Sequence, residues 1–208
     1  MKTKIFSLVA VAAIALGIGN TALAEGKNDS VAKNNNEVST VLADVSKISK
    51  IEVRGNVELY VSDGEADQVK VYNKYYEQSA LVQSQNGVLR ISSYAGQKLV
   101  VWVKSADLRS ITAYDNAEVR SFGKLSPLDL TVTLSDNAYA KLKVDGYGMN
   151  VILKGRAKAD IAGSVEQSNL KYDHSATLNS TEFAAAHLVR TIDGVTKNNT
   201  KADEFAGL

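Results

Sequence analysis

The chain has 208 residues, 24 basic and 23 acidic side chains, and no cysteine. This length allows one domain with a sizeable core, or at most two small ones. The nearly neutral charge argues against a basic face for nucleic acid. The lack of cysteine excludes disulfides, thiolate metal sites and a lipid-modified N-terminal cysteine.

The first 24 residues predict a secretory signal peptide. A basic start with Lys2 and Lys4 precedes an apolar run over residues 5–18, and small residues close the segment at 22–24. A membrane-spanning helix is the alternative, but the run is shorter than the ~20 residues that a span needs. We expect cleavage after Ala24 and an exported protein, periplasmic or extracellular, that is neither a lipoprotein nor membrane-spanning. Cleavage would leave 22 basic against 23 acidic side chains.

Two polar segments flank the rest of the chain. Residues 25–45 are rich in Asn, Lys and Ser and have few apolar side chains to offset the entropy of ordering, so we expect a flexible leader. Residues 198–208 have a similar composition and predict a frayed tail. The sequence between them, residues 46–197, predicts one domain.

The first half of this domain alternates apolar and polar residues. Alternation from Ile51 to Val61 predicts a half-buried strand. Asn86-Gly87 separates two further runs and predicts a hairpin, and the run "KLVVWVK" follows. No window of comparable length outside the signal segment has a helical apolar period, so the predicted fold class is all-β.

The second half repeats itself. The stretch "YDNAEV" at residues 114–119 returns as "SDNAYA" at 135–140. Alignment on the alanines gives a column with spacings of 21, 19, 19 and 19, formed by Ala117, Ala138, Ala157, Ala176 and Val195. Three further columns are apolar throughout: Ile111, Val132, Val151 and Leu170; Ala113, Leu134, Leu153 and Tyr172; Val119, Ala140, Ala159 and Leu178.

Repeats of this kind cannot bury their inner face alone, but stacked repeats can. The columns therefore favour a β-solenoid with about 19–21 residues per rung. An antiparallel sandwich whose strands fall into register by accident is the alternative.

Polar residues mark a corner before each aligned alanine. Asp115-Asn116 and Asp136-Asn137 occupy it in two repeats, and Gly155 takes the equivalent place in the next, with His174 beyond it. Asn and Asp tolerate left-handed backbone and cap nearby amides. We expect Asn116 and Asn137 to lie in or near the left-handed conformation.

The stretch "ISKIEVRGNVELYVSDGEADQVKVY", followed by "VLRIS", resembles the opening of the head-GIN domain family, exported bacterial proteins described as putative autotransporter adhesins. The resemblance continues through the repeats to about Val195. It implies a right-handed β-helix-like fold, with no established biochemical activity. Family members usually carry Gly-Ser-Gly at the corners, and this chain departs from that pattern.

The corner is also the strongest candidate for a surface site. Carboxylates stacked about 4.8 Å apart, the spacing of a sheet, could share Ca²⁺ and orient an acidic sugar, but calcium wants more oxygen ligands than two carboxylates supply. Corner capping is the simpler interpretation. Exposed tyrosines near the corner suit sugar or protein surfaces, although cross-strand pairing would also account for them. The candidate surface-binding residues are Tyr114, Asp115, Asn116, Asp136, Asn137, Tyr139 and Arg156.

These features predict an exported, non-enzymatic β-solenoid that binds a cell-surface glycan or an envelope protein. We predict no catalytic residue, metal site or cofactor. The sequence contains neither a nucleophile-elbow motif nor a phosphate-binding glycine loop. The two histidines have no acidic or thiol residue at the spacing that a shared metal site would need. The alternative is a carbohydrate-active enzyme, similar to a polysaccharide lyase, that uses the corner acids.

Overall fold

The computed structural model describes residues 39–42, 45, 47–72 and 80–200. Within these residues the chain is all-β, as the alternation predicted, and contains no helix. The predicted signal peptide lies outside them. Accordingly, the described residues include no helix long and apolar enough to cross a membrane.

Fourteen strands are described. They are β1 (Ser39–Leu42), β2 (Lys50–Gly55), β3 (Val57–Asp63), β4 (Gln68–Tyr72), β5 (Ala80–Gln85), β6 (Val88–Ser93), β7 (Leu99–Ser105), β8 (Ser110–Ala113), β9 (Glu118–Ser121), β10 (Asp129–Leu134), β11 (Tyr139–Leu153), β12 (Lys158–Tyr172), β13 (Thr177–Ile192) and β14 (Val195–Thr200).

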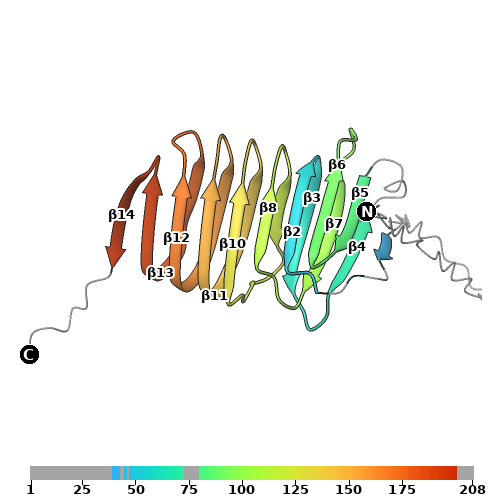
Figure 1. Cartoon of the computed structure of the whole chain (residues 1–208), viewed down its shortest axis with the longest axis horizontal. Coiled ribbons are helices and arrows are strands. Elements are labelled where there is room, and N and C mark those ends of the chain that lie inside the picture. Colours follow the sequence, from blue (N-terminus) through green and yellow to red (C-terminus); the bar gives the residue numbers. More distant parts are fainter. Residues whose placement is uncertain (1–38, 43–44, 46, 73–79, 201–208) are drawn as a thin grey trace, which may run out of the picture. The chain divides into compact units, whose positions relative to one another are not determined.

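The strands form one hydrogen-bonded sheet with two flanks. Flank 1 contains β1, β4, β7, β3 and β9, and flank 2 contains β5, β6, β2, β8 and β10. The first residues of β11 pair with β9, and its last residues pair with β10, so β11 belongs to both flanks. β12 and β13 continue the stack in the same way, and Figure 1 shows the later strands following one another in nearly chain order.

The register confirms the three apolar columns. Val132 lies opposite both Ile111 and Val151, and Val151 lies opposite Leu170. The columns through Leu134 and Ala140 are paired equally well. All these pairs are parallel, so the alternative of an antiparallel sandwich is wrong.

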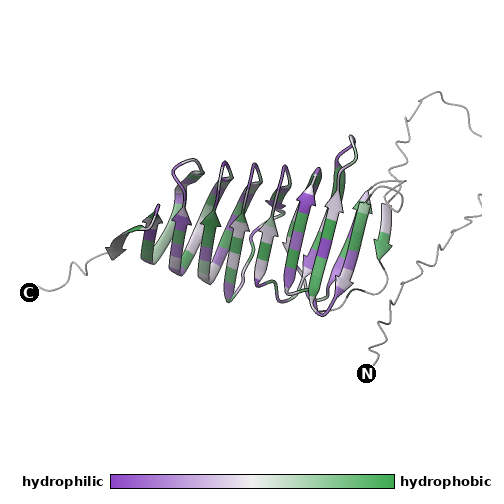
Figure 2. Ribbon diagram, turned by 45° about the horizontal axis from the view of Figure 1, so that its top comes forward, coloured by the Kyte–Doolittle hydropathy of each residue, from purple (hydrophilic) through white to green (hydrophobic). Residues whose placement is uncertain are grey.

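Side chains of these columns fill the space between the flanks. Val132, Val151 and Leu170 are fully buried, and the banding of green and purple along the strands in Figure 2 reflects the alternation of inward apolar and outward polar residues. Each such side chain stabilises the fold by roughly 1.5–3 kcal/mol. The core therefore runs through the whole stack and holds both flanks together.

The predicted single strand from Ile51 to Val61 is in fact two strands. Gly55, with φ of 80°, turns the chain from flank 2 into flank 1 between β2 and β3. A Cβ at this position would lie 2.1 Å from the carbonyl oxygen of Ser93, so glycine is required. The alternation survives the turn, which is why the sequence pattern does not reveal it.

The ends of the stack differ from the sequence expectations. Val195 is not in the alanine column: Asp193 and Gly194, both with positive φ, reverse the chain, and β14 pairs antiparallel with β13. Residues 39–42, assigned to the flexible leader, form β1, which pairs with β4. Residues 198–200 of the predicted tail belong to β14, whereas 201–208 lie outside the described residues.

Candidate functional site

Four aromatic side chains gather on the outer face of flank 1, and we call them the aromatic shelf: Tyr60, Tyr72, Trp102 and Phe122. They meet because Trp102 lies opposite Tyr60 on neighbouring strands, both pointing away from the core. The Tyr60 and Trp102 rings stack with centroids 4.7 Å apart, and Phe122 lies 5.0 Å from Trp102. Phe122 is 61% exposed, so the shelf offers an aromatic surface to solvent.

A network of charges fixes one edge of the shelf. Arg120 donates from Nε to Glu58 Oε1 and from Nη2 to Glu118 Oε2, both at 3.0 Å. Lys98 Nζ donates to Glu118 at 2.6 Å and is the main reason that the pKa of Glu118 lies below its usual value. The hydroxyl of Tyr60 donates to Glu58 at 2.9 Å. Partly exposed ion pairs contribute little stability, so their main effect is to hold Arg120 and Tyr60 in place.

Tyr139 extends this network toward the next repeats. Its hydroxyl donates to Asp160 Oδ2 at 2.6 Å, and the Arg120 guanidinium lies 5.5 Å from the ring centroid. Burial, and then this hydrogen bond, raises the pKa of Tyr139 to about 12. The hydroxyl therefore stays protonated as a donor over the physiological range.

A groove of about 750 Å³ begins beside the shelf and crosses the outer faces of β11, β12 and β13. Tyr60, Phe122 and Arg120 line it at the shelf, and the polar residues Lys141, Lys143, Asp160, Asn179 and Glu182 line it further along. Its volume is within the range of about 300–1,000 Å³ for sites that take small ligands. Aromatic faces together with polar groups suit a ligand that has both apolar and hydroxyl-rich sides.

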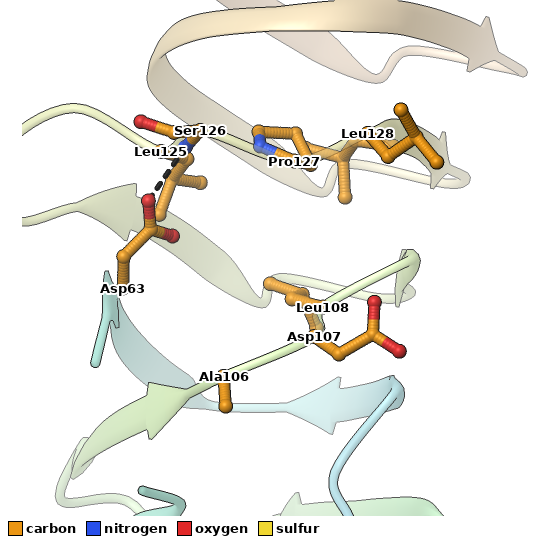
Figure 3. A pocket seen from close by; sticks show the side chains of 9 residues that line it. Asp63, Ala106, Asp107, Leu108, Leu125, Ser126, Pro127 and Leu128 are labelled. Atoms are coloured by element: carbon orange, nitrogen blue, oxygen red, sulfur yellow. Dashed lines mark hydrogen bonds between the residues drawn. The ribbon is translucent and has the colours of Figure 1, made fainter. Parts of the chain in front are cut away.

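A second pocket, of about 150 Å³, lies at the edge where β3 and β7 end (Figure 3). Leu108, Leu125 and Leu128 contribute to its lining, and Asp63 accepts a hydrogen bond from the Ser126 backbone nitrogen at 2.6 Å. Ligand sites are usually larger, and this carboxylate is already paired. We therefore take the groove, not this pocket, as the candidate site.

The corner predicted from the sequence exists, but its left-handed residues are the aspartates. Asp115, Asp136 and Gly155 have φ of 60°, 64° and 65°. The expectation that Asn116 and Asn137 take this conformation is wrong, since neither has a positive φ. The left-handed residue of each Asp-Asn corner is therefore the aspartate, one residue before the predicted asparagine.

The corner carboxylates cap backbone amides of neighbouring repeats. Asp115 Oδ2 accepts from the amide of Gly55 at 3.1 Å, and Asp136 Oδ2 accepts from the amide of Asp115 at 3.2 Å. Asp173 does the same for Gly155 at 3.1 Å. These contacts support the capping interpretation of the corner acids.

The other corner side chains also connect repeats. Asn137 donates to Asn116 at 3.2 Å and accepts from Arg156 Nε at 2.9 Å. The Tyr114 ring lies under the Arg54 guanidinium, 3.8 Å from its centroid. Most hydrogen-bonding groups of this ladder are thus used within the protein.

No group of three or more His, Cys, Asp or Glu suited to a metal ion occurs among the residues that the structure describes. His174 Nδ1 contacts Asp193 Oδ2 at the corner, and His187 Nε2 lies 3.8 Å from Glu166 Oε1. Both histidines are largely exposed. His174 lies in the loop before β13, and His187 lies within β13.

The structure brings six of the seven predicted residues together at the corner and places the seventh, Tyr139, beside the groove. None of the seven lines the groove itself. Sequence reasoning missed Trp102, Phe122 and Arg120. One signal was available: in "KLVVWVK" the inward positions are Leu99, Val101 and Val103, which places the large Trp102 side chain on the outer face.

Comparisons with solved structures reveal the same fold in bacterial proteins of low sequence identity. A putative adhesin from Bacteroides fragilis is 13% identical, with a TM-score of 0.65 over 76% of this chain and 77% of that one. A putative lipid binding protein from Parabacteroides distasonis is 11% identical, with a TM-score of 0.58 over 76% and 79%. A putative adhesin from Parabacteroides merdae is 14% identical, with a TM-score of 0.52 over 76% and 78%.

Comparison with curated proteins gives no match. A family model described as putative auto-transporter adhesin, head GIN domain, matches residues 47–204. This match covers most of the chain and agrees with the resemblance in the opening strands and the repeats. The chain belongs to the family of putative auto-transporter adhesins with a head GIN domain.

Proposed function

We propose that the protein is an exported, non-enzymatic binding module, and that the aromatic shelf and its groove bind a cell-surface glycan. The observation that carries the proposal is the contact of Tyr60, Trp102 and Phe122, because Tyr60 and Phe122 line a groove that also contains polar side chains. The adhesin description of the family supports a binding role.

Sugars have the chemistry that this surface would recognise. One face of a sugar ring presents C–H groups, which pack on aromatic rings, while the hydroxyl groups need hydrogen-bond partners. The shelf offers the first, and Asp160 and Asn179 offer the second within the same groove. The fixed position of Arg120 and Tyr60 reduces the entropy lost on binding.

The architecture that we infer for this module is a right-handed β-solenoid over residues 46–197, following a cleaved export signal. Parallel pairing at offsets of 21 and 19 residues supports it, as do the inward columns shared by successive repeats. Parallel connections in one sheet are almost always right-handed. A solenoid presents long flat faces, which suits the binding of extended polymers.

An array of bacterial and host glycans, probed with the purified protein, tests the proposal. Phe122→Ala should weaken binding about tenfold, since truncation of an aromatic anchor commonly costs on the order of 1–2 kcal/mol. Tyr94→Ala is the matched control, because Tyr94 is an even more exposed aromatic residue (73%) that contacts Asp115 at the corner and does not line the groove. Equal losses in both variants would place the site elsewhere, and turnover of a bound glycan would contradict the non-enzymatic role.

A further inference from the structure

Two lysines in the groove form no ion pair with any residue that the structure describes. Lys141 and Lys143 point outward from β11 and are exposed, and neither side chain forms a hydrogen bond or ion pair with another described residue. The remaining cation of the groove, Arg120, is bound to two carboxylates. The positive charge that is available to a ligand therefore comes from this lysine pair.

The acidic groups near the pair form no ion pair with it. Asp160 lies opposite Lys141 on β12, but its Oδ2 accepts the hydrogen bond of Tyr139, and the Lys141 ammonium group is not within ion-pair distance of it. Glu182 is separated from Lys143 by one strand, at the position opposite Ala162, which corresponds to roughly 9.5 Å across the sheet. Asp145 is held mainly by Lys124 and then by Ser164, and Lys143 makes only the last contribution to its lowered pKa.

The geometry points to an acidic polysaccharide as the ligand of the groove, an inference that rests on the proposed glycan-binding function. Alternate residues on one face of a strand are about 7 Å apart, so the two ammonium groups can flank a single carboxylate or neighbouring ones. Phe122 lines the same groove and offers a surface for the sugar ring. Sugars that carry a carboxylate, such as uronic acids, combine both features.

Calorimetry with two ligands that differ only in charge tests the inference. The probes are an oligogalacturonate and the same oligosaccharide with every carboxylate methyl-esterified. We expect the acidic form to bind about tenfold more tightly at low salt, with the difference shrinking as salt screens the lysines.

The double variant Lys141→Gln/Lys143→Gln should remove this difference and leave binding of the methyl ester unchanged. Lys50→Gln/Lys171→Gln is the matched control, because both lysines are exposed on the outer face of flank 2. This control should keep the full preference for the acidic form.

The outcomes separate the two proposals. Equal affinity for both probes, or a preference that survives in the Lys141/Lys143 variant, would overturn the acidic ligand while leaving glycan binding intact. Failure of the wild-type protein to bind either probe would overturn the acidic ligand, whereas failure to bind any glycan of the array would contradict the proposed function. Loss of methyl-ester binding in Phe122→Ala, together with an unchanged charge preference in the lysine variant, would keep the shelf as the site and reject the role of the lysines.

Discussion

At the corner, Asp115 and Asp136 each receive a backbone amide from a neighbouring repeat, and Asn137 links Asn116 to Arg156. On the aromatic shelf, by contrast, Phe122 packs against the half-buried Trp102 and presents ring surface to solvent beside an open groove. Both regions contain aromatic, basic and acidic side chains. They differ in how many of those side chains are already used to hold the fold together.

This difference shows why residue type alone does not identify a binding surface. A polar group that is bonded within the protein gains little from a ligand, because a new contact must replace an existing one. Exposed aromatic area, and cations that form no ion pair, have no existing contact that a ligand must replace. We therefore expect substitutions at the corner to change stability, and substitutions on the shelf to change binding.

The largest effect should come from the core that supports both regions. Val132→Asp should prevent folding, because it places an unpaired charge at a fully buried position between repeats. Thr133→Asp, on the next and outward position of β10, should be tolerated. Circular dichroism and thermal melting of both variants check this, and similar melting curves would contradict the inward assignment.

A smaller effect should appear at the corner and leave binding unchanged. Asp136→Val should destabilise the protein by about 1–3 kcal/mol, because a β-branched residue is strained at the φ of 64°. Asp136→Asn keeps both an acceptor and tolerance of this φ, so denaturant unfolding should find it close to wild type. If Asp136→Val were as stable as Asp136→Asn, the claim that the corner residues stabilise the fold would be contradicted.

On the shelf, Arg120→Gln should do the reverse. Its side chain is about one-third exposed, so loss of the two ion pairs should change the unfolding free energy by only about 1 kcal/mol or less. The loss of glycan affinity should be larger than the loss of stability, since Arg120 lines the groove and lies beside Tyr60. Chemical denaturation and a binding titration on the same sample would measure both, and a purely destabilising variant would argue for a structural role alone.

The smallest effect concerns Tyr139 and is visible only at high pH. Its pKa is raised from 10.0 to about 12 in the folded protein, so the fold favours the protonated hydroxyl. The resulting stability is complete below about pH 10 and is lost as the pH rises through about 12. Tyr139→Phe should lack this loss, and tyrosinate absorbance together with unfolding curves would follow it. Identical pH dependence in both proteins would contradict the raised pKa of Tyr139.

The sequence predicted the fold better than the site, for a physical reason. The columns through Val132 and Ala140 are readable because burial imposes the same apolar requirement on every repeat. The sequence analysis wrongly placed Val195 in the alanine column, because Val195 follows Ala176 at the same spacing of 19 residues. The chain reversal at Asp193 and Gly194 depends on the backbone geometry of two residues, which the spacing does not reveal. The alternation in "KLVVWVK" places Trp102 on the outer face, but its contact with Phe122 could not be predicted, since Phe122 follows β9 and the two residues meet only in the folded sheet.

Trp102 is the only tryptophan in the chain, so its fluorescence reports directly on the aromatic shelf. Titration of the wild-type protein with a glycan selected from the array should give a saturable change in this emission. The affinity should match that from calorimetry, and the change should persist in Asp136→Asn while weakening about tenfold in Phe122→Ala. Calorimetric binding with no change in Trp102 emission would mean that the ligand binds elsewhere, and would contradict the assignment of the shelf as the binding surface.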